Sequence, residues 1–154
     1  MQGVVCENGK YRISKDSFIH LCERNTGVPI INLARFGHKI TDGEKVIRSN
    51  LSRVDNPEVK YVLLEYGGND CDFNWKGISD FPEDEHPPAT DILKFSDTYL
   101  DIIDLLRSRG KQPVLLSFPP INPDMYFARI HPNESGHRLI AHAVMDRLYE
   151  LVLR

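Results

Sequence analysis

This 154-residue chain has few cysteines, no excess of positive charge and no long apolar run. Three cysteines at irregular spacing fit neither a disulfide framework nor a CxxC metal site, which favours free thiols and a cytoplasmic protein. The net charge of -3 gives no basic surface for nucleic acid, and no run of about 18 apolar residues could span a membrane. No signal peptide is visible, although a truncated N-terminus could hide one.

The apolar share of the sequence, 41%, fits one globular domain with a core, and we treat residues 1–154 as a single domain. Nearly continuous apolar runs predict buried parallel strands at 28–34, 59–66 and 113–118. Apolar residues at helical spacing predict helices from Ser14 to near Gly27 and at 42–54, 90–109 and 133–153.

The predicted order of elements, α-β-α-β-α-β-α, is typical of an α/β protein with a three-layer α/β/α, flavodoxin-like parallel sheet. Each parallel βαβ unit needs a strand before its crossover helix, yet this order begins with a helix. We therefore expect the sheet to be incomplete, with its first, central strand missing. Exposed strand edges would then promote self-association.

Polar segments lie at the places where open α/β sheets build their sites. A Gly-Gly-Asn-Asp turn at 67–70 follows the strongest predicted strand, and a His-Pro-Asn segment at 131–133 precedes the last predicted helix. A third loop, containing Gly37, follows the predicted strand at 28–34. Taken one at a time, such residues serve turns or packing more often than chemistry.

Together these segments resemble sequence blocks of the SGNH (GDSL-type) hydrolase family of esterases and lipases. The match covers most of the chain and includes three of the four name-giving positions, Gly37, Asn69 and His131. The resemblance implies hydrolysis of small carboxylic or carbohydrate acyl esters by a Ser-His mechanism, without a cofactor. His131 would be the general base, Gly37 and Asn69 would donate hydrogen bonds to the oxyanion, and all three should converge at one edge of the sheet.

The chain departs from the family pattern at two positions. It contains no Gly-Asp-Ser, so the nucleophilic Ser is not found, and residues 1–5 look like the tail of that block. The Asp expected three residues before the His is replaced by Ala128, and nothing in the spacing shows that Asp124 takes its place. Ser117 and Ser135 lie in no nucleophile-like context. We interpret the chain as a truncated or degenerate copy.

The segment 71–89 is long, acidic and rich in Pro, and we expect it to lack regular structure. Asp70 and Trp75 are the candidate substrate-binding residues at its start. Trp75 and Phe73 could line an acyl or sugar pocket, but anchoring of the loop to the core explains both aromatic residues equally well.

A different class of function is also open, namely a non-catalytic flavodoxin-like domain that binds a ligand or partner through the same loops. Glycine-rich phosphate-binding motifs are absent, which disfavours a nucleotide ligand. We predict no metal site, because three histidines that invite one share no metal-ligand spacing: His38, His137 and His142.

Overall fold

The computed structural model describes residues 4–7, 10–117, 126–127, 131–132 and 134–152. It combines helices with a small parallel sheet, as an α/β protein does. The chain divides into two compact units, Gly37–Ser117 and the combination of Met1–Phe36 with Phe118–Arg154, and each is described by itself. Within the described ranges, no helix is long and apolar enough to cross a membrane.

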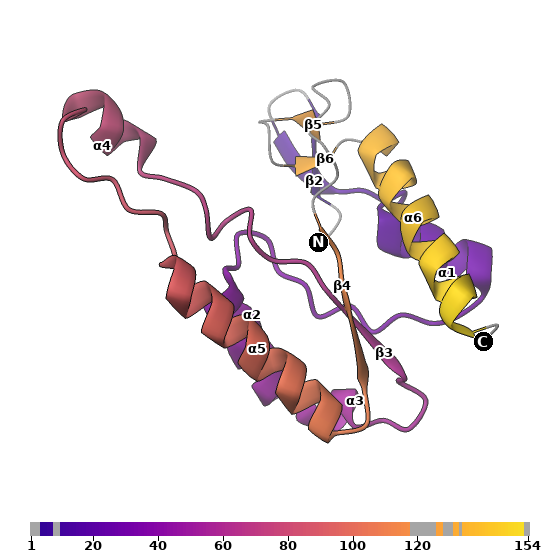
Figure 1. Cartoon of the computed structure of the whole chain (residues 1–154). Helices are drawn as coiled ribbons and strands as arrows, with labels where there is room; N and C mark the ends of the chain where they lie inside the picture. Colours follow the sequence, from indigo (N-terminus) through magenta and orange to yellow (C-terminus); the bar gives the residue numbers. More distant parts are fainter. Residues whose placement is uncertain (1–3, 8–9, 118–125, 128–130, 133, 153–154) are drawn as a thin grey trace. The chain divides into compact units, whose positions relative to one another are not determined.

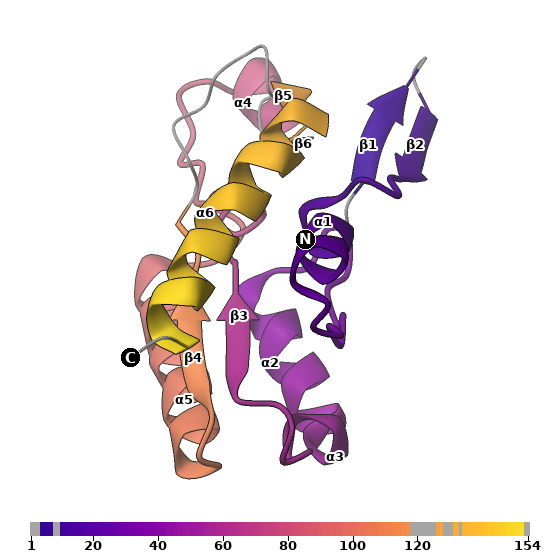
Figure 2. The same ribbon diagram turned by 90° about the vertical axis from the view of Figure 1, so that its right-hand side faces the viewer.

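The Gly37–Ser117 unit is built on two parallel strands, β3 (Tyr61–Leu64) and β4 (Gln112–Leu115). Their register aligns Leu63 with Val114 and Leu64 with Leu115, and Figure 2 shows the two arrows running in the same direction. Apolar runs predict both strands, and the structure confirms them with shorter bounds. Helix α5 (Ile92–Ser108) lies between them in the sequence, so this part of the chain is a βαβ unit.

Three helices pack around this pair of strands, α2 (Ile40–Ser49), α3 (Leu51–Val54) and α5, and a fourth, short helix lies in the segment before α5. Helix α5 is confirmed as predicted, with an N-terminal cap at Asp91, whose side chain accepts hydrogen bonds from the amides of Leu93 and Lys94. Helices α2 and α5 pack against each other, and α5 also packs on β4 (Figure 1). The buried core comes from these helices and β3: Ile40, Ile47, Val54, Leu64, Ile102 and Leu106.

Tyr66 follows β3 and packs on the middle of α2 at Gly43. A Cβ atom at position 43 would overlap the Tyr66 ring, so only glycine leaves room for it. The edge of Tyr66 also meets Tyr99 of α5, with ring centroids 6.5 Å apart. Burial, followed by the nearby charges of Glu65, Asp70 and Asp42, raises the pKa of Tyr66 to about 12.

The other unit centres on helices α1 (Phe18–Thr26) and α6 (Glu134–Val152), which pack side by side (Figure 1). Gly27 ends α1 in a left-handed conformation, φ 69°, and its amide donates to the carbonyl of Glu23, as the sequence predicts for this glycine. The buried apolar residues of the pair are Phe18, Ile19 and Cys22 from α1, and Ile140, Ala141, Val144 and Met145 from α6.

Two small antiparallel pairs belong to this same unit. Strand β1 (Val4–Glu7) pairs with β2 (Lys10–Ile13), and β5 (Tyr126–Phe127) pairs with β6 (His131–Pro132). The predicted order opened on a helix, so the hairpin ahead of α1 is an addition. It forms its own two-stranded sheet and adds no strand to the β3–β4 pair.

The predicted strand at 28–34 is wrong. The structure has no strand there, and Val28 and Ile31 are 59% and 43% exposed. Nearby side chains take the amides that a strand ladder would use: the amide of Ile30 donates to Glu23, and that of Ala34 donates to Asn32. Local hydrogen bonds of this kind compete with a sheet, and an apolar run by itself does not provide a neighbouring strand.

Candidate functional site

The Gly-Gly-Asn-Asp turn at 67–70 follows β3 after two residues, at the strand exit where the sequence predicts it. Gly67 has φ 129°, a conformation that side chains other than glycine rarely adopt, and its carbonyl accepts the amide of Cys71 at 2.8 Å. The turn places Asn69 and Asp70 at the carboxyl end of the strand, where open α/β sheets bind ligands.

The Asn69 side chain joins this turn to the loop that contains Gly37. Its Nδ2 donates to the carbonyl of His38 at 3.1 Å, and the preceding residue, Gly37, is left-handed with φ 76°. Two of the three predicted site positions therefore lie on loops that are hydrogen-bonded to each other. The Asn69 amide carries two N–H groups, and only one has a partner within the described part of the chain.

Asp70 is 3% exposed and holds three segments together. Its carboxylate accepts from the amide of Ile40 at 3.0 Å, from the amide of Gly67 at 3.2 Å and from the hydroxyl of Thr90 at 2.7 Å. A buried carboxylate needs such donors to offset the loss of water. The structure thus gives Asp70 an internal role as an acceptor, whereas its predicted contact with a substrate stays a prediction.

The segment 72–89 starts and ends at this turn. Its ends are tied by two backbone hydrogen bonds of 2.9 Å, from the amide of Thr90 to the carbonyl of Asp70 and from the amide of Ala89 to the carbonyl of Asp72. The Lys39 ammonium group also donates to the carbonyl of Ala89 at 3.2 Å. A long segment with adjoining ends is an Ω-like loop, a type of loop that often carries function.

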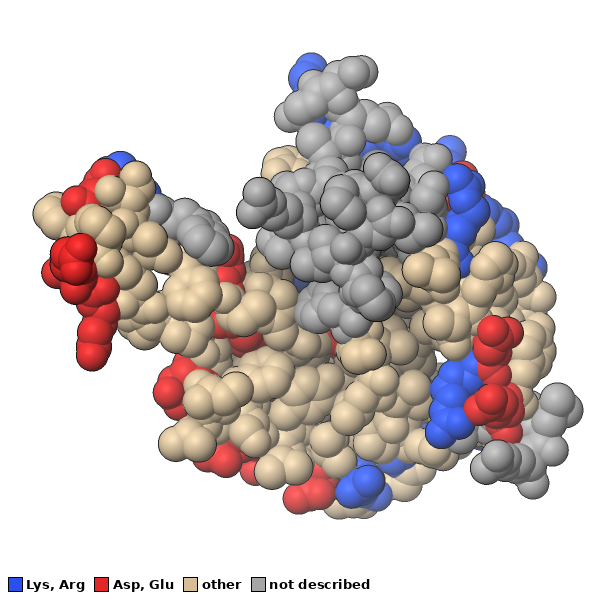
Figure 3. Space-filling model, turned by 45° about the horizontal axis from the view of Figure 1, so that its top comes forward, with Lys and Arg blue, Asp and Glu red and all other residues tan. Residues whose placement is uncertain are grey.

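This loop is less irregular than expected, because it contains a short helix, α4 (Trp75–Asp80). Asn74 caps the helix by accepting from the amide of Gly77. The Trp75 side chain lies outside the described residues, so its substrate contact stays a prediction. Phe81 is 64% exposed. Acidic side chains gather on the surface of this loop, at the left of Figure 3.

His131 lies where the sequence predicts it, just ahead of the last helix. It belongs to β6 and is paired with Phe127, and α6 begins three residues later at Glu134. The His131 side chain and Ala128 lie outside the described residues. His131 also belongs to a different unit from Gly37 and Asn69, so the convergence of the three stays a prediction.

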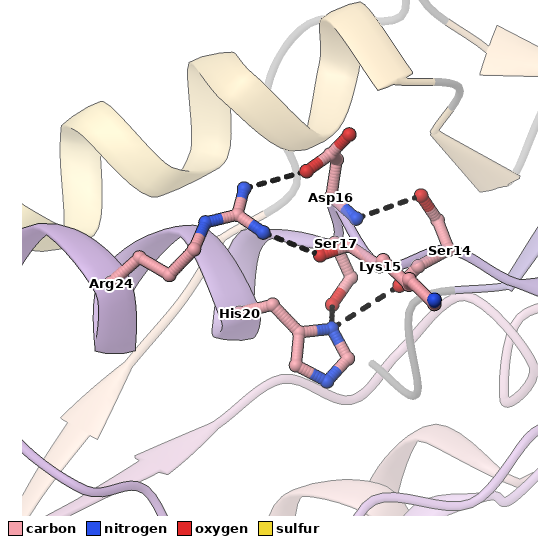
Figure 4. Close-up of polar contacts among 6 residues, drawn as sticks. All are labelled: Ser14, Lys15, Asp16, Ser17, His20 and Arg24. Carbon is pink, nitrogen blue, oxygen red and sulfur yellow. Dashed lines mark hydrogen bonds and ion pairs between the residues drawn. The ribbon is translucent and has the colours of Figure 1, made fainter.

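A Ser-His pair that the sequence reading missed lies at the start of α1. The Ser17 hydroxyl and the Nδ1 atom of His20 are 2.8 Å apart, and the same Nδ1 lies 3.2 Å from the carbonyl of Ser14 (Figure 4). A serine and a histidine three residues apart at a predicted helix start are the sequence signal for such a pair. Ser17 is 1% exposed, which denies a substrate access to its hydroxyl, so the pair fastens the start of α1.

An ion pair also belongs to the start of α1. Arg24 approaches Asp16 at 2.6 Å and donates to the carbonyl of Lys15 at 3.0 Å (Figure 4). The hydrogen bond from Arg24 lowers the pKa of the exposed Asp16 carboxyl.

Within the described ranges, no group of three or more His, Cys, Asp or Glu side chains is placed to hold a metal ion.

A scan against protein-family models, a search of curated proteins and a search of solved structures find no match for this chain. Support for a function therefore comes from the residues and their geometry.

Proposed function

We propose that this chain is a hydrolase domain of the SGNH type, acting on small carboxylic or carbohydrate acyl esters. The observation that carries the proposal is the hydrogen bond from the Asn69 amide to the carbonyl of His38, which ties the Asn69 turn to the Gly37 loop at 3.1 Å. The remaining N–H of Asn69 and the backbone amide of Gly37 would then donate to the same developing oxyanion.

The proposed reaction is acyl transfer through a serine. His131 accepts the serine proton, the serine oxygen attacks the ester carbon, and the carbonyl oxygen becomes an oxyanion held by Gly37 and Asn69. His131 then gives its proton to the leaving oxygen as the intermediate collapses, which releases the alcohol. In the second half, His131 accepts a proton from the water that attacks the acyl-enzyme and returns it to the serine as the acid is released. The sequence contains no Gly-Asp-Ser, so in this proposal the chain is a degenerate copy whose own activity is low.

The same proposal includes a single domain with a three-layer, flavodoxin-like sheet that lacks its first, central strand. The β3–β4 pair supports it, since two parallel strands with α5 between them are the repeating unit of such sheets. We also place the protein in the cytoplasm, because the free thiols of Cys22 and Cys71 suit a reducing compartment.

Complementation with a nucleophile tests the function. The chain would be extended at its N-terminus by an apolar strand ending in Gly-Asp-Ser, with Gly-Asp-Ala as the matched control. We expect the first to hydrolyse p-nitrophenyl acetate and the second, together with a His131→Ala variant of the first, to remain near the uncatalysed rate. Loss of the general base and nucleophile each costs orders of magnitude in rate.

Two results would contradict this assignment. A folded Gly-Asp-Ser chain without His131-dependent hydrolysis would favour the alternative, a binding domain that uses the same loops. A His131-dependent burst of p-nitrophenol from the chain without the extension would show that another residue is the nucleophile.

We further propose that the protein self-associates through exposed strand edges. The β3–β4 sheet supports this, because each strand of a two-stranded sheet has one edge without a neighbouring strand. The apolar segment 28–34 makes no backbone-to-backbone hydrogen bond with another described residue, so it is a segment that pairs with such an edge of a second copy in this proposal. Sedimentation velocity should show dimers or larger species that an Ile31→Lys variant weakens and a Leu139→Lys variant, on the exposed face of α6, does not. A monomer at all concentrations would refute this.

A further inference from the structure

Thr90 stands one residue ahead of the N-terminal cap of α5, and its hydroxyl donates to Asp70. Asp91 caps α5 by accepting from the amides of Leu93 and Lys94. The Thr90 hydroxyl donates to Oδ1 of Asp70 at 2.7 Å, the shortest of the hydrogen bonds to that carboxylate. Thr90 is thus free of the capping role that its position suggests.

The hydrogen bond from the Thr90 hydroxyl restricts the orientation of the Asp70 carboxylate. Oδ1 accepts from Thr90, Oδ2 accepts from the amide of Gly67 at 3.2 Å, and the amide of Ile40 is shared between them, at 3.0 Å from Oδ1 and 3.2 Å from Oδ2. The donors at Ile40 and Gly67 belong to the backbone and point in fixed directions. Turning of the carboxylate would therefore lengthen its hydrogen bonds to these two loops, and the Thr90 hydroxyl opposes that turn.

The two loops that Asp70 holds are the ones that present the oxyanion donors of the proposed function. Ile40 follows Gly37 by three residues, and Gly67 precedes Asn69 by two. We propose that Thr90 is a positioning residue, which acts through Asp70 to hold the Gly37 loop and the Asn69 turn at the spacing that a common oxyanion requires. The role of Gly37 and Asn69 as oxyanion donors rests on the proposed function. The hydrogen bonds of Thr90 and Asp70, which we call the clamp, rest on distances and burial.

The clamp also connects the donors to the 72–89 loop. The amide of Thr90 donates to the carbonyl of Asp70, so Thr90 contacts Asp70 through both its backbone and its side chain. The neighbouring carbonyl of Ala89 accepts from Lys39, which lies in the Gly37 loop. A structural change at the point where the two ends of the 72–89 loop meet would therefore shift both the Gly37 loop and the Asn69 turn, through the hydrogen bonds of Ala89 and Thr90.

Nuclear magnetic resonance of the chain as it exists tests the clamp. The probes are the side-chain amide of Asn69 and the backbone amides of Gly37, Ile40 and Gly67. In a Thr90→Val variant, which keeps the side-chain shape and removes the hydroxyl, we expect all four signals to move and hydrogen exchange at Ile40 and Gly67 to accelerate about tenfold. Thr90→Ser should restore the wild-type signals because it returns the hydroxyl.

The matched control is Thr98→Val, within helix α5, which begins just after Thr90. Thr98 is buried and its hydroxyl donates to the carbonyl of Lys94 at 2.7 Å, so this variant also removes a threonine hydroxyl without touching Asp70. The proposal is overturned if Thr90→Val leaves the Asn69 and Gly37 signals in place. It is also overturned if Thr98→Val moves them equally, because the effect would then be one of general stability.

An activity readout separates this proposal from the proposed function. In the chain extended by Gly-Asp-Ser, Thr90→Val should lower kcat about tenfold or more with little change in KM, since misplaced oxyanion donors weaken the transition state more than the bound ester. An inactive extended chain combined with the expected resonance shifts would refute the hydrolase and retain the clamp. An active extended chain whose kcat is unaffected by Thr90→Val would refute the positioning role.

Discussion

The backbone amide of Ile40 donates to the carboxylate of Asp70, at 3.0 Å from Oδ1 and 3.2 Å from Oδ2. Asp70, which follows β3 in the sequence, thus places its carboxylate at the N-terminus of α2, where unpaired amides and the helix dipole favour a negative charge. The start of α2 and the Gly-Gly-Asn-Asp turn are consequently held together by this carboxylate.

Replacement of Asp70 by Asn should destabilise the protein by about 2–4 kcal/mol, because the amide places an N–H group against backbone donors in a buried site. Urea denaturation followed by circular dichroism would measure this change. Asp97→Asn, on the exposed side of α5, is the control and should change the free energy of unfolding by less than about 0.5 kcal/mol. Equal effects of the two variants would rule out a special role for the Asp70 carboxylate.

Gly43→Ala should also destabilise the protein, although this change in a helix interior ordinarily stabilises by about 0.5–1 kcal/mol. The added methyl group overlaps the Tyr66 ring, and such overpacking costs about 1–3 kcal/mol. A double-mutant cycle with Tyr66→Ala would locate the cause. In the Tyr66→Ala background Gly43→Ala should become stabilising, and a persistent penalty would show that Tyr66 is not the obstacle.

Stability should fall as the pH rises from about 10 to about 12. Burial is the main cause that raises the pKa of both Tyr66 and Tyr99 from 10.0 to about 12. Below pH 10 both phenols are protonated in the folded and unfolded chains; above it the unfolded chain releases these protons first, which favours unfolding.

Urea denaturation at a series of alkaline pH values would reveal this loss. Tyr66→Phe and Tyr99→Phe should each flatten the pH dependence, because neither phenylalanine carries a proton to release. Tyr149→Phe, at an exposed position on α6, controls for the removal of a hydroxyl group. A profile that stays equally steep in all three variants would assign the alkaline loss to other groups.

The two described cysteines should differ in reactivity by at least about a thousandfold, since a core thiol reacts only when the protein opens. Cys71 is exposed, whereas Cys22 is 1% exposed and its thiol lies 3.8 Å from the carbonyl of Ala141. Burial also raises the pKa of the Cys22 thiol and so lowers its thiolate fraction.

Reaction with Ellman's reagent in a Cys6→Ser variant would separate the two thiols into a fast and a slow phase. Addition of Cys71→Ser should remove the fast phase alone, and the slow phase should merge with it in denaturing urea. A fast phase that survives in the Cys71→Ser variant would mean that Cys22 is accessible in the folded protein.

Local sequence signals predict the elements whose determinants lie within them. Helix α5 follows from its apolar stripe, its Asp91 cap and Gly110, and α1 ends at Gly27 because glycine adopts the left-handed conformation at low cost. The apolar runs of β3 and β4 likewise predict strands, and the Gly-Gly-Asn-Asp turn is found at the predicted strand end. In each case, the residues that decide the structure are neighbours in the sequence.

Long-range contacts decided what the sequence did not. The run at 28–34 reads as a strand, but a strand requires a partner, and here the amides of Ile30 and Ala34 bond to nearby side chains. The sequence also predicts a substrate contact for Asp70, which stays a prediction. Only the tertiary structure shows that Asp70 accepts hydrogen bonds from Ile40 and Thr90. The contacts of Asp70 join it to groups 20 and 30 residues away in the sequence, and the fate of 28–34 depends on whether a partner strand lies beside it. No local pattern encodes either.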